Sequence, residues 1–171
     1  MRSRHLIAEA LSATASTERE KVRAALDWLV AQPAAARAFV VLSHPTALRS
    51  IGDPKFVQFC VQRGGLLLDL PECALDEREQ AAAQGVFGDP KQVSLAEICS
   101  GAVSSLFTFQ LACGDDVETA VGLALVTFVH VFRVEPVFVV ECGHTEGEGG
   151  GGGGQALPRP PIEGVLPEVT S

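Results

Sequence analysis

Asparagine and tyrosine are absent from this 171-residue sequence, and positive charge is scarce in it. Thirteen lysines and arginines stand against 21 aspartates and glutamates, which gives a formal net charge of −8. Proteins that bind nucleic acid need a basic stripe for the phosphate backbone, and this sequence has none. The charge balance therefore excludes nucleic acid as the expected ligand and favours a basic protein or peptide partner.

The cysteines never form a CxxC pair and are odd in number; they are Cys60, Cys73, Cys99, Cys113 and Cys142. This pattern argues against a disulfide framework and is typical of reduced thiols in the cytoplasm or nucleus. We expect neither a cofactor nor a metal. Cys142 and His144 are a close pair of zinc-ligand types, but structural zinc takes four ligands at motif spacing. His44, Cys60 or Cys113 could join them only through the fold.

No apolar run is long enough to cross a membrane. The most apolar stretch, residues 120–140, is interrupted by His130, Arg133 and Glu135, so its uncharged core is shorter than the ~20 residues of a span. We expect a buried helix there. The first 17 residues lack the apolar core of a secretory signal. They resemble a mitochondrial transit peptide, but Glu9 counts against it, and the start of a helix is the expectation.

Helix-start signals recur along the chain. Thr17 with Glu20 forms a capping-box pattern that predicts a helix through Val30. Asp53 and Asp89 each precede a proline, as an N-cap precedes the first helical position. With these signals, apolar periodicity predicts further helices over 55–61, 66–70, 76–84, 91–99, 103–111 and 117–132. Periodicity does not decide between helix and strand for 38–42 and 136–141; if both are strands, an α+β fold is expected instead.

A three-part unit occurs twice. The tetrapeptide GDPK begins at Gly52 and again at Gly88. Each copy continues with a glycine break, an apolar segment and an acidic turn. The corresponding positions are 36, 37 and 39 residues apart. A nearly fixed period in this range is typical of helical solenoids.

The second copy carries a family resemblance. Ser100-Gly101-Ala102-Val103, followed by Gly114-Asp115-Asp116-Val117, resembles the armadillo repeat, and Glu20–Leu29 looks like the third helix of that repeat. The resemblance implies an all-α, right-handed superhelix whose third helices line a peptide-binding groove. The chain departs from the family in one respect. An asparagine in that groove grips the peptide backbone, and this sequence has none, so binding of nuclear-localisation signals is not expected.

We therefore expect an N-terminal segment over 1–16, a short armadillo-like solenoid over 17–142 and a disordered Gly- and Pro-rich tail over 143–171. The expected function is that of a non-catalytic scaffold or adaptor that binds a peptide or partner helix. The repeat alignment places four residues in the groove: Asp27, Trp28, Gln84 and Thr127. So short a solenoid leaves both ends uncovered, which favours a homodimer.

Residues 47–53 suggest an alternative function. They resemble the BH3 segment of the Bcl-2 apoptosis regulators, although Pro54 would break that helix and the Asn-Trp-Gly-Arg signature of the family is missing. A Bcl-2-like regulator would bind BH3 peptides, which distinguishes it from a scaffold.

Other polar features have simpler interpretations. His130 is expected to be a hydrogen-bonded core or surface residue rather than a catalytic base. The glycine run at 149–154 lacks the Lys-Ser/Thr of a phosphate-binding loop and is expected to be a linker. Asp115, Asp116 and Glu118 are expected to satisfy amide donors at a helix start. No nucleophile–base pair stands out, so we do not expect an enzyme.

Overall fold

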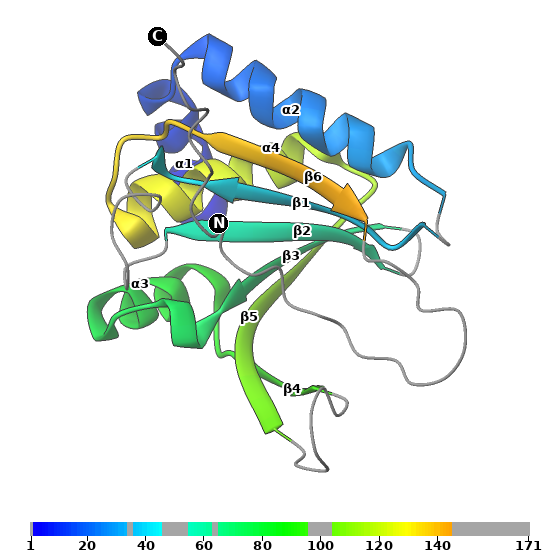
Figure 1. Cartoon of the computed structure of the whole chain (residues 1–171). Helices are drawn as coiled ribbons and strands as arrows, with labels where there is room; N and C mark the ends of the chain where they lie inside the picture. Colours follow the sequence, from blue (N-terminus) through cyan, green and yellow to red (C-terminus); the bar gives the residue numbers. More distant parts are fainter. Residues whose placement is uncertain (1, 34–35, 46–54, 63–64, 96–103, 145–171) are drawn as a thin grey trace, which may run out of the picture.

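The structure is a computed structural model of the chain, and it describes residues 2–33, 36–45, 55–62, 65–95 and 104–144 (Figure 1). Its elements, in chain order, are α1 (Arg2–Ala13), α2 (Ser16–Val30), β1 (Ala38–Ser43), β2 (Phe56–Gln62), β3 (Gly65–Pro71), the 3-10 helix η3 (Glu72–Ala74), α3 (Glu77–Phe87), β4 (Lys91–Leu95), β5 (Ser104–Gly114), α4 (Val117–Val126), the π-helical turn η4 (Thr127–Phe132) and β6 (Val139–His144).

The six described strands form one sheet in the order β4-β5-β3-β2-β1-β6, and every neighbouring pair is antiparallel. Cross-strand partners share a face of the sheet. Val40 of β1 therefore faces the same side as Phe59 of β2 and Cys142 of β6, with which it is in register. One face carries the core, because Val40, Leu42, Phe59 and their aligned neighbours are fully buried.

The helices pack on this apolar face, so the described part of the chain has two layers (Figure 1). α4 lies at the centre of the helix layer, and all residues from Ala120 to Val126 are buried. A helix that is apolar all round must be enclosed on every side. α1 and α2 pack against α4, and α3 packs against the π-turn that follows it. The predicted buried helix at the start of 120–140 is thus confirmed.

The predicted all-α, armadillo-like helical repeat is wrong, because the chain contains a six-stranded antiparallel sheet. The segments assigned to helices at 55–61, 66–70, 91–99 and 103–111 instead supply β2, β3, β4 and β5. The GDPK motif does not open a helix. In its second copy, Gly88 ends α3 with φ of 85° and Lys91 begins β4. Most of the first copy lies outside the described residues.

These segments were predicted to be helices because a short apolar run fits the 3.6-residue repeat of a helix as well as the two-residue repeat of a strand. In β2 the residues Val57 and Phe59 alternate with Gln58 and Cys60, yet the run is apolar enough to form a helical stripe as well. β-branched and aromatic residues favour a pleated surface. Pairing with β1 on one side and β3 on the other supplies backbone partners along β2 and buries Val57 and Phe59 completely, which decides for a strand.

The two segments for which periodicity did not decide between helix and strand both contain strand residues, since 38–42 lies within β1 and 139–141 within β6.

Helix prediction succeeded where local capping is strong. Asp76 caps α3 in a complete capping box with Glu79. α2 matches its predicted span but begins at Ser16 after Ala15, without the side-chain cap expected from Thr17. The N-terminal segment forms α1, and its Ala10 is fully buried in the core.

Candidate partner-binding site

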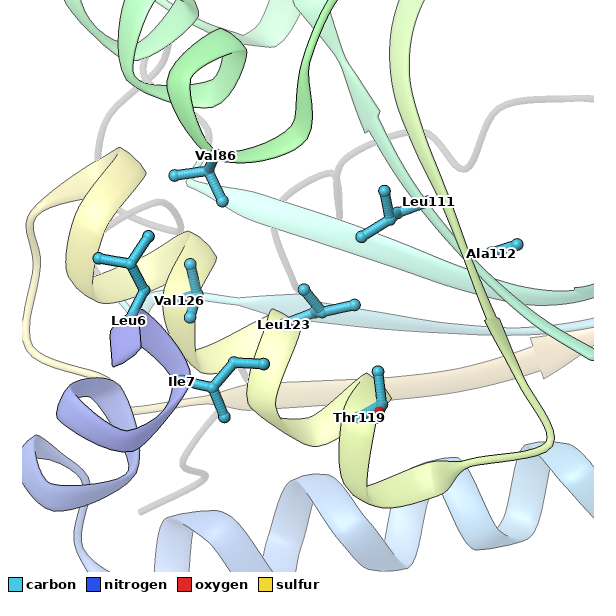
Figure 2. Close-up of a pocket in the computed structure, with 8 residues that line it drawn as sticks. All are labelled: Leu6, Ile7, Val86, Leu111, Ala112, Thr119, Leu123 and Val126. Carbon is cyan, nitrogen blue, oxygen red and sulfur yellow. The ribbon is translucent and has the colours of Figure 1, made fainter. Parts of the chain in front are cut away.

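An apolar pocket of about 210 Å³ lies between α1, α3, α4 and β5 (Figure 2). Its walls are Leu6, Ile7, Val86, Leu111, Ala112, Thr119, Leu123 and Val126. Sites for drug-sized molecules and cofactors occupy ~300–1,000 Å³. The pocket is smaller than this range, so it matches the size of one apolar side chain better than that of a cofactor.

Close packing of α1 on α4 forms one wall of the pocket. A Cβ on Gly122 would lie only 2.7 Å from Cγ2 of Ile7, so α1 reaches this position because Gly122 has no side chain. Leu123 and Val126 are three positions apart on α4 and therefore share a helix face. Val86 near the end of α3 and Leu111 on β5 complete the opposite side (Figure 2).

An acidic side chain, Asp116, lies at the rim of the pocket and is hydrogen-bonded to the hydroxyl group of Thr119, which lines it. Thr119 donates from Oγ1 to Oδ2 of Asp116 over 2.6 Å, and its backbone N–H donates to Oδ1 of the same carboxylate over 3.2 Å. These hydrogen bonds hold the pKa of Asp116 below its ordinary value. Asp115 and Glu118 are exposed beside it, and Glu118 pairs with Arg23. As expected, Asp116 satisfies amide donors at the start of α4.

The four residues expected to line a groove do not share a surface. Asp27 is exposed on α2, whereas the neighbouring Trp28 packs edge-on against His144 with ring centroids 5.4 Å apart. Gln84 lies on the exposed side of α3 and donates to Asp89 over 2.7 Å. Thr127 is fully buried and donates to the carbonyl of Leu123 over 2.8 Å. The solenoid groove that joined them does not exist in this fold.

A buried ion pair stands at the border of the helix layer. Lys55, which precedes β2, pairs with Glu79 of α3, and both residues are buried. The ammonium of Lys55 also lies 5.7 Å from the ring centre of Phe132. The other carboxylate oxygen of Glu79 accepts from the backbone N–H of Asp76 over 3.1 Å. One carboxylate thus caps α3 and ties it to β2, which is a structural role.

The opposite face of the sheet carries a polar cluster. Asp69 accepts two hydrogen bonds at Oδ1, from Thr108 over 2.8 Å and from Gln110 over 3.0 Å. The Cys60 thiol lies nearby. Burial raises its pKa to about 11, and the charge of Asp69 adds to the effect. The thiol is therefore protonated near neutral pH, and a protonated thiol is a poor nucleophile.

His130 lies in the π-turn, and its buried Nε2 has no hydrogen-bond partner among the described residues. This Nε2 lies 3.9 Å from Oε2 of Glu9. His144 instead packs on Trp28 and lies 3.2 Å from the amide oxygen of Gln32. Within the described residues, no group of three or more histidine, cysteine or acidic side chains could hold a metal.

Residues 47–53 and 145–171 lie outside the described residues, so the BH3-like segment and most of the predicted tail have no structural account. No described helix combines the length and the hydropathy that a membrane crossing requires. Comparisons with protein-family models, curated proteins and solved structures found no match. The sequence does not predict the pocket, because its walls come from four elements that only the fold brings together.

Proposed function

We propose that the protein is a non-catalytic interaction module whose pocket receives one apolar side chain of a basic peptide or partner helix. The main support for this proposal is the apolar pocket with an acidic rim at Asp116. Removal of an apolar side chain from water supplies the affinity, about 1.5–3 kcal/mol for a leucine or phenylalanine. The carboxylates at the rim select for lysine or arginine next to that side chain.

The charge of the chain supports a basic partner. The net charge of −8 attracts a cationic ligand before contact, and the exposed Asp116 is hydrogen-bonded to Thr119 of the pocket. The thiols support a role without covalent chemistry. Burial raises the pKa of both Cys60 and Cys113 to about 11. The four described cysteines are free thiols, which suits a reducing compartment such as the cytoplasm or nucleus.

The test starts from peptides selected against the full chain from a random displayed library. We expect the selected sequences to share a large apolar residue flanked by lysine or arginine. Binding is then followed in protein labelled at isoleucine δ1-methyl groups. The chain has four isoleucines, and Ile7 lines the pocket. The Ile7 methyl signal should shift on titration with a selected peptide.

Two matched pairs of variants sharpen the test. Val86→Lys places a charge in the pocket and should weaken binding about 10-fold or more, whereas Ala81→Lys adds the same charge to the exposed side of α3 and should change it less than about 2-fold. Asp116→Asn keeps an N-cap but removes a rim charge, with a loss of about 3-fold. Asp76→Asn makes the same change at α3 and should have no effect. Acidic consensus peptides, a silent Ile7 signal, or equal binding by Val86→Lys would overturn the proposal.

A further inference from the structure

An apolar row crosses the open face of the sheet, which is the face opposite the helices. Phe39 of β1 is in register with Gly143 of β6 and with Cys60 of β2, and Cys60 is in register with Leu67 of β3. Cross-strand partners share a face, so these four residues form a line across four adjacent strands (Figure 1). With strands about 4.8 Å apart, the row is about 14 Å long. Phe39, Cys60 and Leu67 are half-buried and lie outside the core.

The ring of Phe39 lies over the β6 strand. A Cβ on Gly143 would come within 2.6 Å of Cζ of Phe39, so the ring occupies the space that a side chain at Gly143 would fill. This contact places an aromatic surface at the β6 end of the row. Aromatic-lined surfaces bind proline-rich segments in the polyproline II conformation. The row thus has the chemistry of a site for an extended, proline-rich ligand.

A second row, with two carboxylates, runs beside the apolar one. It contains Glu141 of β6 and Asp69 of β3, which are connected through Val41 and Gln58 in register. The two rows are two positions apart along the strands, which is about 7 Å. Glu141 is exposed, and the two hydrogen bonds that Asp69 accepts from described side chains both end on Oδ1. The open face therefore offers an apolar row with negative charge along one side.

We propose that residues 157–161 of this chain, Leu-Pro-Arg-Pro-Pro, dock on the apolar row as a polyproline II segment. These residues lie outside the described ones. Three of the five are prolines, which favour this conformation. It rises about 3.1 Å per residue, so five residues cover about 15 Å, close to the length of the row. Its backbone makes no hydrogen bonds within the segment and stays solvated, so it can lie across the strands on a face that offers side chains alone.

The charge of this segment matches the face. Arg159 is the only lysine or arginine among residues 145–171. It is the middle one of the five residues, so docking brings its guanidinium to the row that contains Asp69 and Glu141. Arginine pairs with carboxylates through a planar fork of donors. A proline-rich segment with a carboxylate in this position would be repelled.

The end of β6 brings the segment within reach of the row. β6 ends at His144, directly after Gly143 of the row. Residues 145–156 follow, and with six consecutive glycines they have the composition of a flexible linker. A linker of twelve such residues spans about 19 Å on average, more than the length of the row. Covalent attachment also gives the segment an effective concentration of the order of mM, so a weak contact is sufficient for docking.

The inference is tested by nuclear magnetic resonance on the full chain, labelled at the methyl groups of isoleucine, leucine and valine. We expect nuclear Overhauser contacts between the prolines of 157–161 and the methyl groups of Leu67. The methyl group of Ile162, which follows the segment, should relax as slowly moving groups of the folded domain do. Because docking occurs within one chain, both signals should be unchanged between about 20 and about 500 µM protein.

Charge variants complete the test. Arg159→Glu should reduce the ratio of docked to free segment at least about 10-fold, whereas Thr170→Glu adds a carboxylate beyond the segment and should leave the ratio unchanged. Asp69→Asn keeps an acceptor for Thr108 and Gln110 but removes the charge, with a loss of about 3-fold.

Glu141→Gln should cause a similar loss, and Glu20→Gln on the exposed side of α2 is its control, with no expected effect. Three results would overturn the inference. They are the absence of contacts between the prolines and Leu67, contacts that survive Arg159→Glu undiminished, and contacts that disappear on dilution, which would assign the segment to a second copy.

Discussion

The two faces of the sheet bury their side chains in different ways. On the helix side, Phe59, Leu68 and Phe109 belong to one continuous core that also includes α1, α2, α3 and α4. On the other side, Phe39 is half-buried and does not belong to that core, and Asp69 gathers polar neighbours. No described helix packs on this second face. The helix side therefore carries most of the stability of the fold.

Each face also holds one carboxylate with several partners. Glu79 on the helix side is buried, pairs with Lys55 and caps α3. Asp69 on the other side is half-buried and accepts from two neutral side chains. The electrostatic interaction of a charge with its partner grows as water is excluded, and so does the cost of leaving that charge unpaired. The same functional group should thus matter far more on the helix side.

The largest expected effect comes from this pair of carboxylates. Glu79→Ala removes the buried carboxylate that pairs with Lys55 and caps α3, and it should lower the free energy of unfolding by about 3–5 kcal/mol. Asp69→Ala should cost about 1–2 kcal/mol, for the lost hydrogen bonds of Thr108 and Gln110. Urea unfolding monitored by circular dichroism measures both. Lys55→Met combined with Glu79→Leu should recover most of the loss, and equal losses in the two single variants would erase the difference between the faces.

A matched pair of phenylalanines tests the apolar side of the comparison. Phe59→Ala empties a fully buried site in the core and should cost about 3–4 kcal/mol. Phe39 rests against Gly143 at the sheet surface, and Phe39→Ala should cost less than about half as much. Thermal and urea unfolding of both variants give the two values. Should Phe39→Ala prove as costly as Phe59→Ala, the second face would be as well packed as the first.

The smallest expected effect is on alkaline stability. Burial raises the pKa of Cys60, on the open face, and of Cys113, at the core, from the ordinary 9.0 to about 11. The unfolded chain ionises first as pH rises, so the contribution of each thiol is complete below pH 9 and lost between pH 9 and 11. Cys60→Ala and Cys113→Ala should each reduce the drop in urea midpoint over this window. An unchanged drop in both variants would show that these thiols do not cause it.

The sequence predicted best where a signal is local. Asp76 and Glu79 form a capping box that needs no other part of the chain, and α3 begins where they place it. α2 was recognised from its apolar stripe, because Val22, Leu26 and Leu29 repeat at helical spacing. For the candidate site, the sequence led only to the expectation of a basic partner, which stays a prediction, and it named none of the residues that line the pocket. Asp27, Trp28, Gln84 and Thr127 depended on a helical repeat that the chain does not form.

By itself the sequence determined the acidic charge, the helix starts at Asp76 and Asp116, and the buried character of the segment from Ala120 to Val126. Only the tertiary structure decided that β2, β3 and β5 are strands, because a short apolar run fits a helix face and a pleated face alike until a neighbouring strand pairs with it. The tertiary structure also decided where the pocket lies and that β6 is an edge strand of the described sheet. Both features depend on contacts between elements far apart in the chain, and local residue spacing does not predict which elements will be in contact.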